Sequence, residues 1–181
     1  MSSEQLAEID KAYSISAKLT SDERAYVTAL HPTEKQRTDA NWRYEGLHVL
    51  LWALGYVPTL SYPDSMCEVA PDVKIIHDLT EVQFRQRAKL RSKKEILDQA
   101  DLILHLDWAC TEARLKKQPA PGELNSDAVV ESHHALNWLI KYGDQEWDDA
   151  HIAREFEAWQ ADPGDFTYFD GGFSTPSATG Y

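Results

Sequence analysis

The stretch Asp39–Gly55, DANWRYEGLHVLLWALG, decides the fold class of this 181-residue chain. From Leu47 to Leu54 every position but His48 is apolar. A helix that is apolar all round is a buried helix, and glycine is the residue type that most often follows the last turn of a helix. The stretch therefore predicts a central helix that the rest of the chain must cover.

Helical spacing of apolar residues continues on both sides of this stretch. Thr20 with Glu23, and Ser92 with Glu95, have the spacing of capping boxes, in which a hydroxyl and a carboxylate satisfy free amides at a helix start. Pro58, Pro63 and Pro71 mark residues 56–71 as a loop. The further expected helices cover residues 3–19, 20–30, a segment that Asp72 caps and that runs into residues 85–94, and then 92–117, 127–142 and 149–160.

No segment alternates with period two for long enough to build a sheet. The sequence thus predicts an all-α protein, a compact single-domain helical bundle of about six to seven helices over residues 1–162, with an aromatic-rich C-terminal tail over residues 163–181. The spread of the tryptophans is typical of core filling; they are Trp42, Trp52, Trp108, Trp138, Trp147 and Trp159. The aromatic residues of the tail are expected to pack back onto the domain.

Negative charge is concentrated at the C-terminal end. The whole chain carries a net charge of −12, and residues 122–181 hold twelve acidic and two basic side chains, a net charge of −10. This balance argues against general binding to nucleic acid or to anionic membranes, because their phosphates would repel the surface. Six basic residues crowd into residues 85–94, and we interpret that run as a solvated junction between two helices.

The sequence also indicates in which cellular compartment the protein is expected. The first residues lack the basic and apolar regions of a signal peptide, and the longest apolar stretch is shorter than the roughly 20 residues of a spanning helix. Cys67 and Cys110 have no metal-type spacing and form no disulfide framework, so a reducing cytoplasm is expected.

Polar residues enter two of the apolar helices. Buried polar groups must be paired, so a core polar network is expected of Arg43, Glu45, Glu131, His134 and Asn137. A second interpretation remains open: Glu45 with His48, and Glu131 with His134, are Glu-x-x-His pairs, half of the ligand set of di-metal carboxylate bundles.

Other chemistries have less support. The chain has no phosphate loop, no dinucleotide fingerprint and no nucleophile elbow. Acidic neighbours beside both cysteines would raise the thiol pKa, which disfavours a nucleophile. We therefore expect no cofactor under the preferred hypothesis.

Several motifs together resemble a known family. They are Trp42-Arg43-Tyr44-Glu45, Leu50 to Gly55, Lys89 to Asp98, Trp108-Ala109, Glu131 to Leu139 and Trp147-Asp148-Asp149. In this order and spacing they resemble the bacterial DUF4272 domain, a family of unknown function, over about residues 39–149. The chain has Ser132 where members tend to have arginine, and it continues beyond Asp149 where members tend to end. The resemblance implies no reaction.

Three functions remain open. The preferred hypothesis is a non-catalytic protein whose acidic C-terminal third binds a basic partner protein, as an immunity or antitoxin-type inhibitor binds a bacterial toxin. The residues expected to bind the partner are Asp144, Glu146, Asp148, Asp149, Glu155, Glu157, Asp162, Asp165, Phe166, Tyr168 and Phe169. The alternatives are a metal-dependent enzyme that uses the two Glu-x-x-His pairs and a structural or oligomerisation module.

Overall fold

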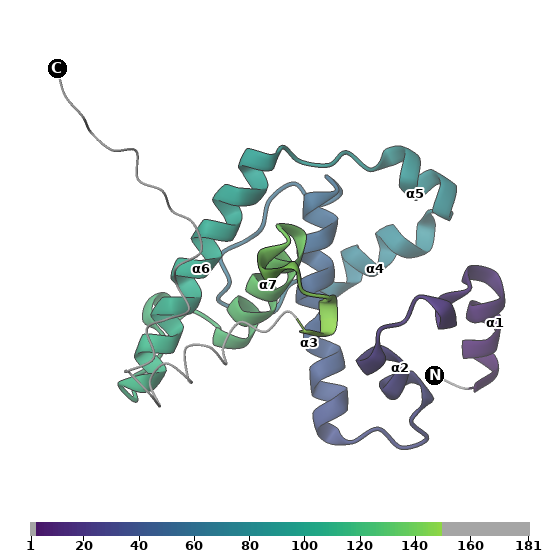
Figure 1. The fold of residues 1–181 in the computed structure, drawn as a ribbon, viewed down its shortest axis with the longest axis horizontal. Helices are drawn as coiled ribbons and strands as arrows, with labels where there is room; N and C mark the ends of the chain where they lie inside the picture. The colour runs from purple at the N-terminus through teal and green to yellow at the C-terminus, as the bar shows by residue number, and fades with distance from the viewer. Residues whose placement is uncertain (1–2, 150–181) are drawn as a thin grey trace. The chain divides into compact units, whose positions relative to one another are not determined.

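The computed structural model describes residues 3–149 (Figure 1). The chain divides into two units, Met1–Ala150 and His151–Tyr181, and all the described residues belong to the first. The expected helix over 149–160, the aromatic tail and the expected boundary between residues 162 and 163 lie outside the described residues.

The described residues form an all-α fold, as the sequence predicts, and contain no strand. The seven α-helices are α1 (Ser3–Tyr13), α2 (Ser21–Thr28), α3 (Glu34–Ala53), α4 (Val69–Asp78), α5 (Glu81–Arg87), α6 (Lys93–Leu115) and α7 (Ser126–Leu139). Four single turns of 3-10 helix accompany them, η1 (Ile15–Ala17), η2 (Pro121–Glu123), η3 (Tyr142–Asp144) and η4 (Trp147–Asp149). None of the described helices is both long and apolar enough to cross a membrane.

Capping boxes begin four of these helices. The two that the sequence predicts are confirmed. The Thr20 side chain accepts a hydrogen bond from the backbone amide of Glu23, and the Ser92 side chain accepts one from the backbone amide of Glu95. Two more use glutamine in place of glutamate, and they begin at Thr33 and Thr80. Thr33 therefore begins α3 five residues before the predicted start. Thr80 divides the region after Asp72 into two short helices rather than one.

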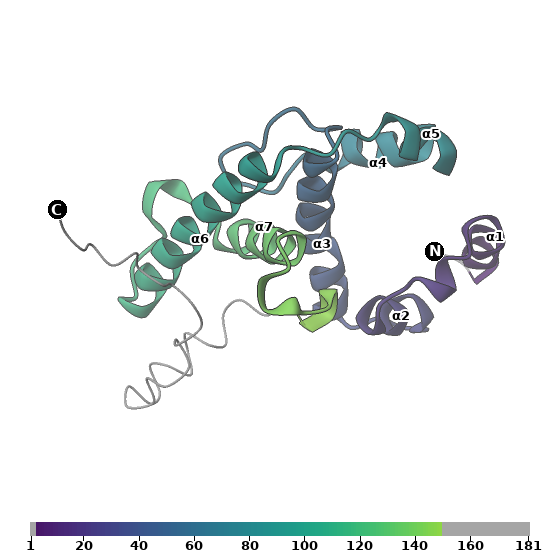
Figure 2. The same cartoon turned by 45° about the horizontal axis from the view of Figure 1, so that its top comes forward.

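The core lies where α7 packs against both α3 and α6 (Figures 1 and 2). The central helix that Asp39–Gly55 predicts is confirmed, because Val49, Leu51 and Ala53 are each 1% exposed. Val129, Ala135 and Leu136 of α7 are fully buried against this core. Because α7 contacts both long helices, it fixes the residues of all three relative to one another.

The basic run is partly structural. Arg91 Nε donates to the carbonyl of Trp52 at 2.8 Å, and Nη2 donates to the carbonyls of Val57 and Pro58 at 3.0 and 2.6 Å. The guanidinium also lies 4.8 Å from the centroid of a Trp52 ring. Arg91 thus holds the segment before α6 against the end of α3, which the interpretation as a solvated junction did not foresee.

Candidate functional site

A cluster of polar side chains lies between α3 and α4. Glu45 and His48 are one turn apart on α3, Cys67 precedes α4, and Asp72 lies in the first turn of α4. His48 Nδ1 is 2.7 Å from Asp72 Oδ2, and Asp72 is only 2% exposed. The expectation that Asp72 caps a helix is wrong, because α4 already begins at Val69 and turns this carboxylate inward to His48.

Glu45 fixes the position of Cys67. The backbone amide of Cys67 donates to Glu45 Oε1, and its thiol donates to the carbonyl of Tyr44 at 3.6 Å. Glu45 itself is 5% exposed. Burial, together with the charges of Glu45 and Asp72, raises the pKa of the Cys67 thiol to about 12. A thiol with such a pKa is a poor nucleophile.

Three potential metal ligands of this cluster lie close together. One ligand atom each from His48, Cys67 and Asp72 lie within 4.8 Å of one another. Within the part of the chain that the structure describes, this group takes only His48 from the two Glu-x-x-His pairs. Glu131 and His134 lie on α7, where the His134 ring packs edge-on against Trp147 with a centroid distance of 4.7 Å.

A cavity of about 280 Å³ adjoins the cluster. His48, Glu68 and Asp72 supply its polar wall. Tyr56, Val57, Pro58, Thr59, Ser61, Pro71 and Ile75 complete the lining. The cluster is therefore reachable by a small ligand from one side.

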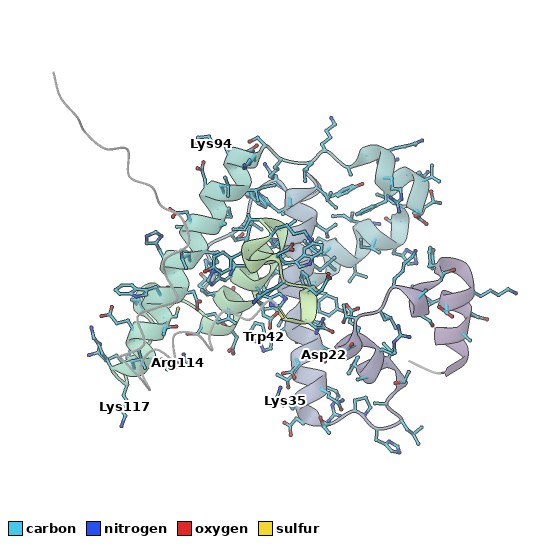
Figure 3. The ribbon with its side chains drawn as sticks, in the orientation of Figure 1. Asp22, Lys35, Trp42, Lys94, Arg114 and Lys117 are labelled. Carbon is cyan, nitrogen blue, oxygen red and sulfur yellow. The ribbon has the colours of Figure 1, made fainter. Side chains whose placement is uncertain are left out.

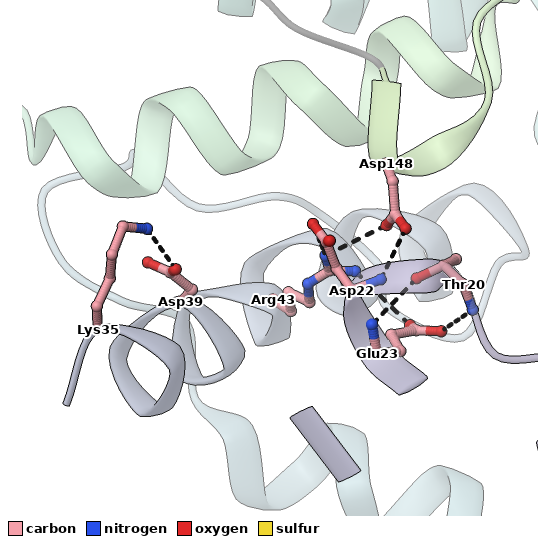
Figure 4. A network of polar contacts seen from close by, with 7 residues as sticks. All are labelled: Thr20, Asp22, Glu23, Lys35, Asp39, Arg43 and Asp148. Atoms are coloured by element: carbon pink, nitrogen blue, oxygen red, sulfur yellow. Dashed lines mark hydrogen bonds and ion pairs between the residues drawn. The ribbon is translucent and has the colours of Figure 1, made fainter. Parts of the chain in front are cut away.

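A second polar network surrounds Arg43 (Figure 4). Its Nη2 lies 3.4 Å from Asp148 Oδ1 and 3.7 Å from Asp22 Oδ2, and Nη1 lies 3.7 Å from Glu23 Oε1. Asp148 Oδ2 also accepts from the backbone amide of Asp22 at 3.0 Å. Three separate segments of sequence thus meet here, and the network connects α2 to α3 and to the 3-10 turn η4 that comes after α7.

The predicted core polar network is only partly brought together. Burial raises the pKa of Glu131, although the charge of Arg43 lowers it and those of Asp39, Asp127 and Glu45 raise it again. Arg43, Glu45 and Glu131 therefore share one electrostatic environment. His134 instead contacts Trp147, and Asn137 is half-buried on α7.

The structure places Asp148 partly buried against Arg43, not on a free acidic surface. Its side chain is 17% exposed. Burial raises its pKa, but the hydrogen bonds from Asp22, Thr20 and Arg43 outweigh that effect and lower it overall. Asp144 and Glu146 are exposed, as a partner-binding role requires. The side chains of Asp149 and of the predicted partner-binding residues from Glu155 to Phe169 lie outside the described residues.

An apolar row runs along an exposed face of α6, the helix that Figure 3 shows between the labels Lys94 and Arg114. The α6 row consists of Leu97, Leu104, Trp108 and Leu115, which are 41% to 53% exposed. Spacings of seven, four and seven residues place them in a narrow arc of the helix. The expectation that Trp108 fills the core is therefore wrong. Apolar residues occur on both faces of α6, so the sequence alone did not show which face is buried.

Another buried pair lies under this helix. His133 Nδ1 is 2.9 Å from Asp107 Oδ2, and the two residues are 4% and 8% exposed. The pair joins α7 to α6 inside the core.

The comparisons with known proteins name a family and no activity. No curated protein and no solved structure matches the chain. The model of the family described as "Domain of unknown function (DUF4272)" matches residues 1–150, and so includes the first two helices that the sequence motifs left out. The chain belongs to the DUF4272 family.

Proposed function

We propose that this protein functions by binding a basic partner protein, and that the α6 row is a principal contact. The observation that carries the proposal is the exposure of four large apolar side chains along one face of a well-packed helix. Contiguous exposed apolar patches on soluble proteins mark interaction sites. Tryptophan at the centre of such a patch is a frequent hot spot.

The spacing of the α6 row suits a helix of the partner. Leu97, Leu104, Trp108 and Leu115 occupy positions of a heptad seam, with Asp101 and Thr111 at the two intervening positions. A partner helix would bury the four apolar residues and meet two polar ones. Polar residues in a seam restrict register and partner choice, so such an interface would favour one partner over others.

The acidic end of the chain supplies the reason for a basic partner. Exposed Asp144 and Glu146 belong to a segment with a net charge of −10, and like charges at that density repel one another unless an opposite surface compensates them. Complementary charge speeds association and rejects acidic proteins. Neutralising a basic toxin is one activity that this combination would serve.

Variants of surface residues test the proposal. The protein is used to capture partners from its own host at moderate salt, and the affinity of the captured protein is then measured in purified form. Leu104→Glu places a charge in the α6 row, while Val82→Glu makes the same change at a 63% exposed position on α5. We expect Leu104→Glu to weaken binding by about 10-fold or more, as for a central interface residue, and Val82→Glu to leave it unchanged.

A charge-reversed variant tests the acidic part separately. Asp144→Lys with Glu146→Lys should lower the association rate and its dependence on salt. Asp148 is left unchanged because it is bound to Arg43. Equal binding by all three variants would contradict the proposal. A homodimer in light scattering that Leu104→Glu dissociates would also contradict it, since the row would then pair with a second copy.

A further inference from the structure

The cluster between α3 and α4 buries two carboxylates, and His48 contacts one of them. Glu45 and Asp72 are 5% and 2% exposed. Among the described residues, no lysine or arginine forms an ion pair with either carboxylate, and His48 is the only basic partner of Asp72. Buried carboxylates are normally paired with a cation or coordinate a metal. The negative charge of the cluster is therefore only partly neutralised by the chain's own side chains.

The side chains that surround this charge are those of a transition-metal site. We propose that His48, Cys67 and Asp72 bind a divalent transition-metal ion, with Zn²⁺ as the ion that their chemistry fits. Their ligand atoms lie within 4.8 Å of one another. Zinc binds sulfur at about 2.3 Å and nitrogen or oxygen at about 2.0–2.2 Å, so one ion can reach all three after small side-chain movements.

The ligand types select against the commonest cellular cations. A thiolate and an imidazole are soft or borderline ligands that favour Zn²⁺ over Mg²⁺ and Ca²⁺, which prefer oxygen alone. The 2.7 Å contact between His48 Nδ1 and Asp72 Oδ2 already holds two ligands side by side. The ion takes the place of that hydrogen bond and holds Cys67 as the thiolate.

Glu45 acts as the supporting residue of this site. Its carboxylate accepts a hydrogen bond from the backbone amide of Cys67 and so fixes the segment between α3 and α4 that carries the thiol. Residues that orient metal ligands in this way raise metal affinity without touching the ion. This places Glu45 of the predicted metal pair beside the ion rather than on it.

Three protein ligands leave one position of a tetrahedral ion unfilled. Zinc sites of this kind keep the fourth position for water or a small ligand, whereas purely structural sites use four protein ligands. The cavity of about 280 Å³ is lined by His48 and Asp72, so it reaches two of the three ligands. The structure thus assigns the fourth position to a small molecule that enters from this cavity.

Cobalt substitution gives the most direct test. The untagged full-length protein is stripped with chelator and titrated with Co²⁺ alone, then with Zn²⁺ in competition against a chromophoric chelator. We expect one ion per chain, a thiolate-to-cobalt charge-transfer band in the near ultraviolet, and tetrahedral absorption in the visible range. Cys67→Ser should remove the charge-transfer band and weaken Zn²⁺ binding by more than about 100-fold, because changes at outer residues alone cost about 10- to 100-fold.

The second cysteine provides the matched control. Cys110→Ser removes a thiol from the buried core and should leave the cobalt spectrum unchanged. His48→Gln should lower Zn²⁺ affinity, with circular dichroism confirming that the variant is folded. A wild-type protein that gives no charge-transfer band with Co²⁺ overturns the proposal, as does a Cys67→Ser variant that binds Zn²⁺ like the wild type. Neither result bears on binding through the α6 row.

Discussion

A Cβ atom on Gly55 would lie 2.7 Å from the backbone carbonyl oxygen of Lys89. The two segments are joined by backbone hydrogen bonds, from Lys89 N to Leu54 O at 2.8 Å and from Arg91 N to Ala53 O at 2.9 Å. Gly55 also has φ of +80°. The junction between the end of α3 and the connector before α6 therefore requires glycine, both for its conformation and for its lack of a side chain.

Gly55→Ala should destabilise the protein strongly. The positive φ alone costs a residue with a side chain about 1–2 kcal/mol, and the contact with the Lys89 carbonyl adds to this cost. Gly143→Ala is the matched control, because Gly143 has φ of +64° and the nearest atom to its Cβ would be 3.5 Å away. Urea unfolding followed by tryptophan fluorescence measures both variants. Equal losses of stability would show that the close approach at Gly55 does not matter.

Arg91→Ala should also lower stability, because it removes the side-chain donor to the carbonyls of Val57 and Pro58 and one of the two donors to the carbonyl of Trp52, which keeps the amide of Gly55. Hydrogen bonds to a charged group contribute about 1.5–3 kcal/mol, and we expect a loss of at least this size. Arg85 pairs with Glu81 on the surface, where such pairs contribute about 0.5 kcal/mol or less. Arg85→Ala should therefore leave the unfolding midpoint almost unchanged, and an equal effect of the two variants would argue against a structural role for Arg91.

Glu131→Gln should change how stability depends on pH. Burial raises the pKa of Glu131 in the folded state above its ordinary value of 4.5. The protonated form therefore favours folding below pH 4.5, and this contribution is lost as the pH rises through the raised pKa. The variant should gain stability relative to the wild type between pH 4 and pH 7. Thermal unfolding across that range measures the stability of both proteins. A stability difference between them that does not change with pH would refute the expectation.

Cys67 should react slowly with alkylating reagents in the metal-free protein. A thiol whose pKa rises from 9.0 to about 12 holds roughly 1000-fold less thiolate at pH 8, and the thiolate is the reactive form. Iodoacetamide labelling in the presence of chelator, with peptide mass spectrometry to separate Cys67 from Cys110, measures the rate. We expect labelling of Cys67 to be slower by two to three orders of magnitude than in urea. Similar rates in the two conditions would contradict the surroundings described for this thiol.

The helical fold could be predicted because its signals are local. The apolar run that ends at Gly55 and the capping boxes at Thr20 and Ser92 each depend on neighbouring residues only. Trp108 shows the limit of such signals, because a helix with apolar residues on both faces does not reveal which face is covered. That choice is made by α7, which packs against α6, where Ala100, Ile103 and Cys110 are buried and Trp108 is not.

The cluster between α3 and α4 was predictable only in part. Glu45 and His48 could be related by their spacing on one helix. Cys67 and Asp72 join them through the packing of α4 against α3, across a connector whose course the sequence pattern does not specify. The same reason applies to Asp148, whose partners Arg43 and Asp22 are more than 100 residues away in the chain.

The central claim is that the α6 row contacts another protein, and crosslinking at single positions tests it most directly. A photoreactive benzoyl-phenylalanine is placed at position 104 or, as the control, at position 82, and each protein is irradiated in the host that encodes it. We expect one discrete crosslinked species from position 104 that contains a basic protein and is absent from position 82. Failure to crosslink at position 104, or the same products from both positions, would contradict it.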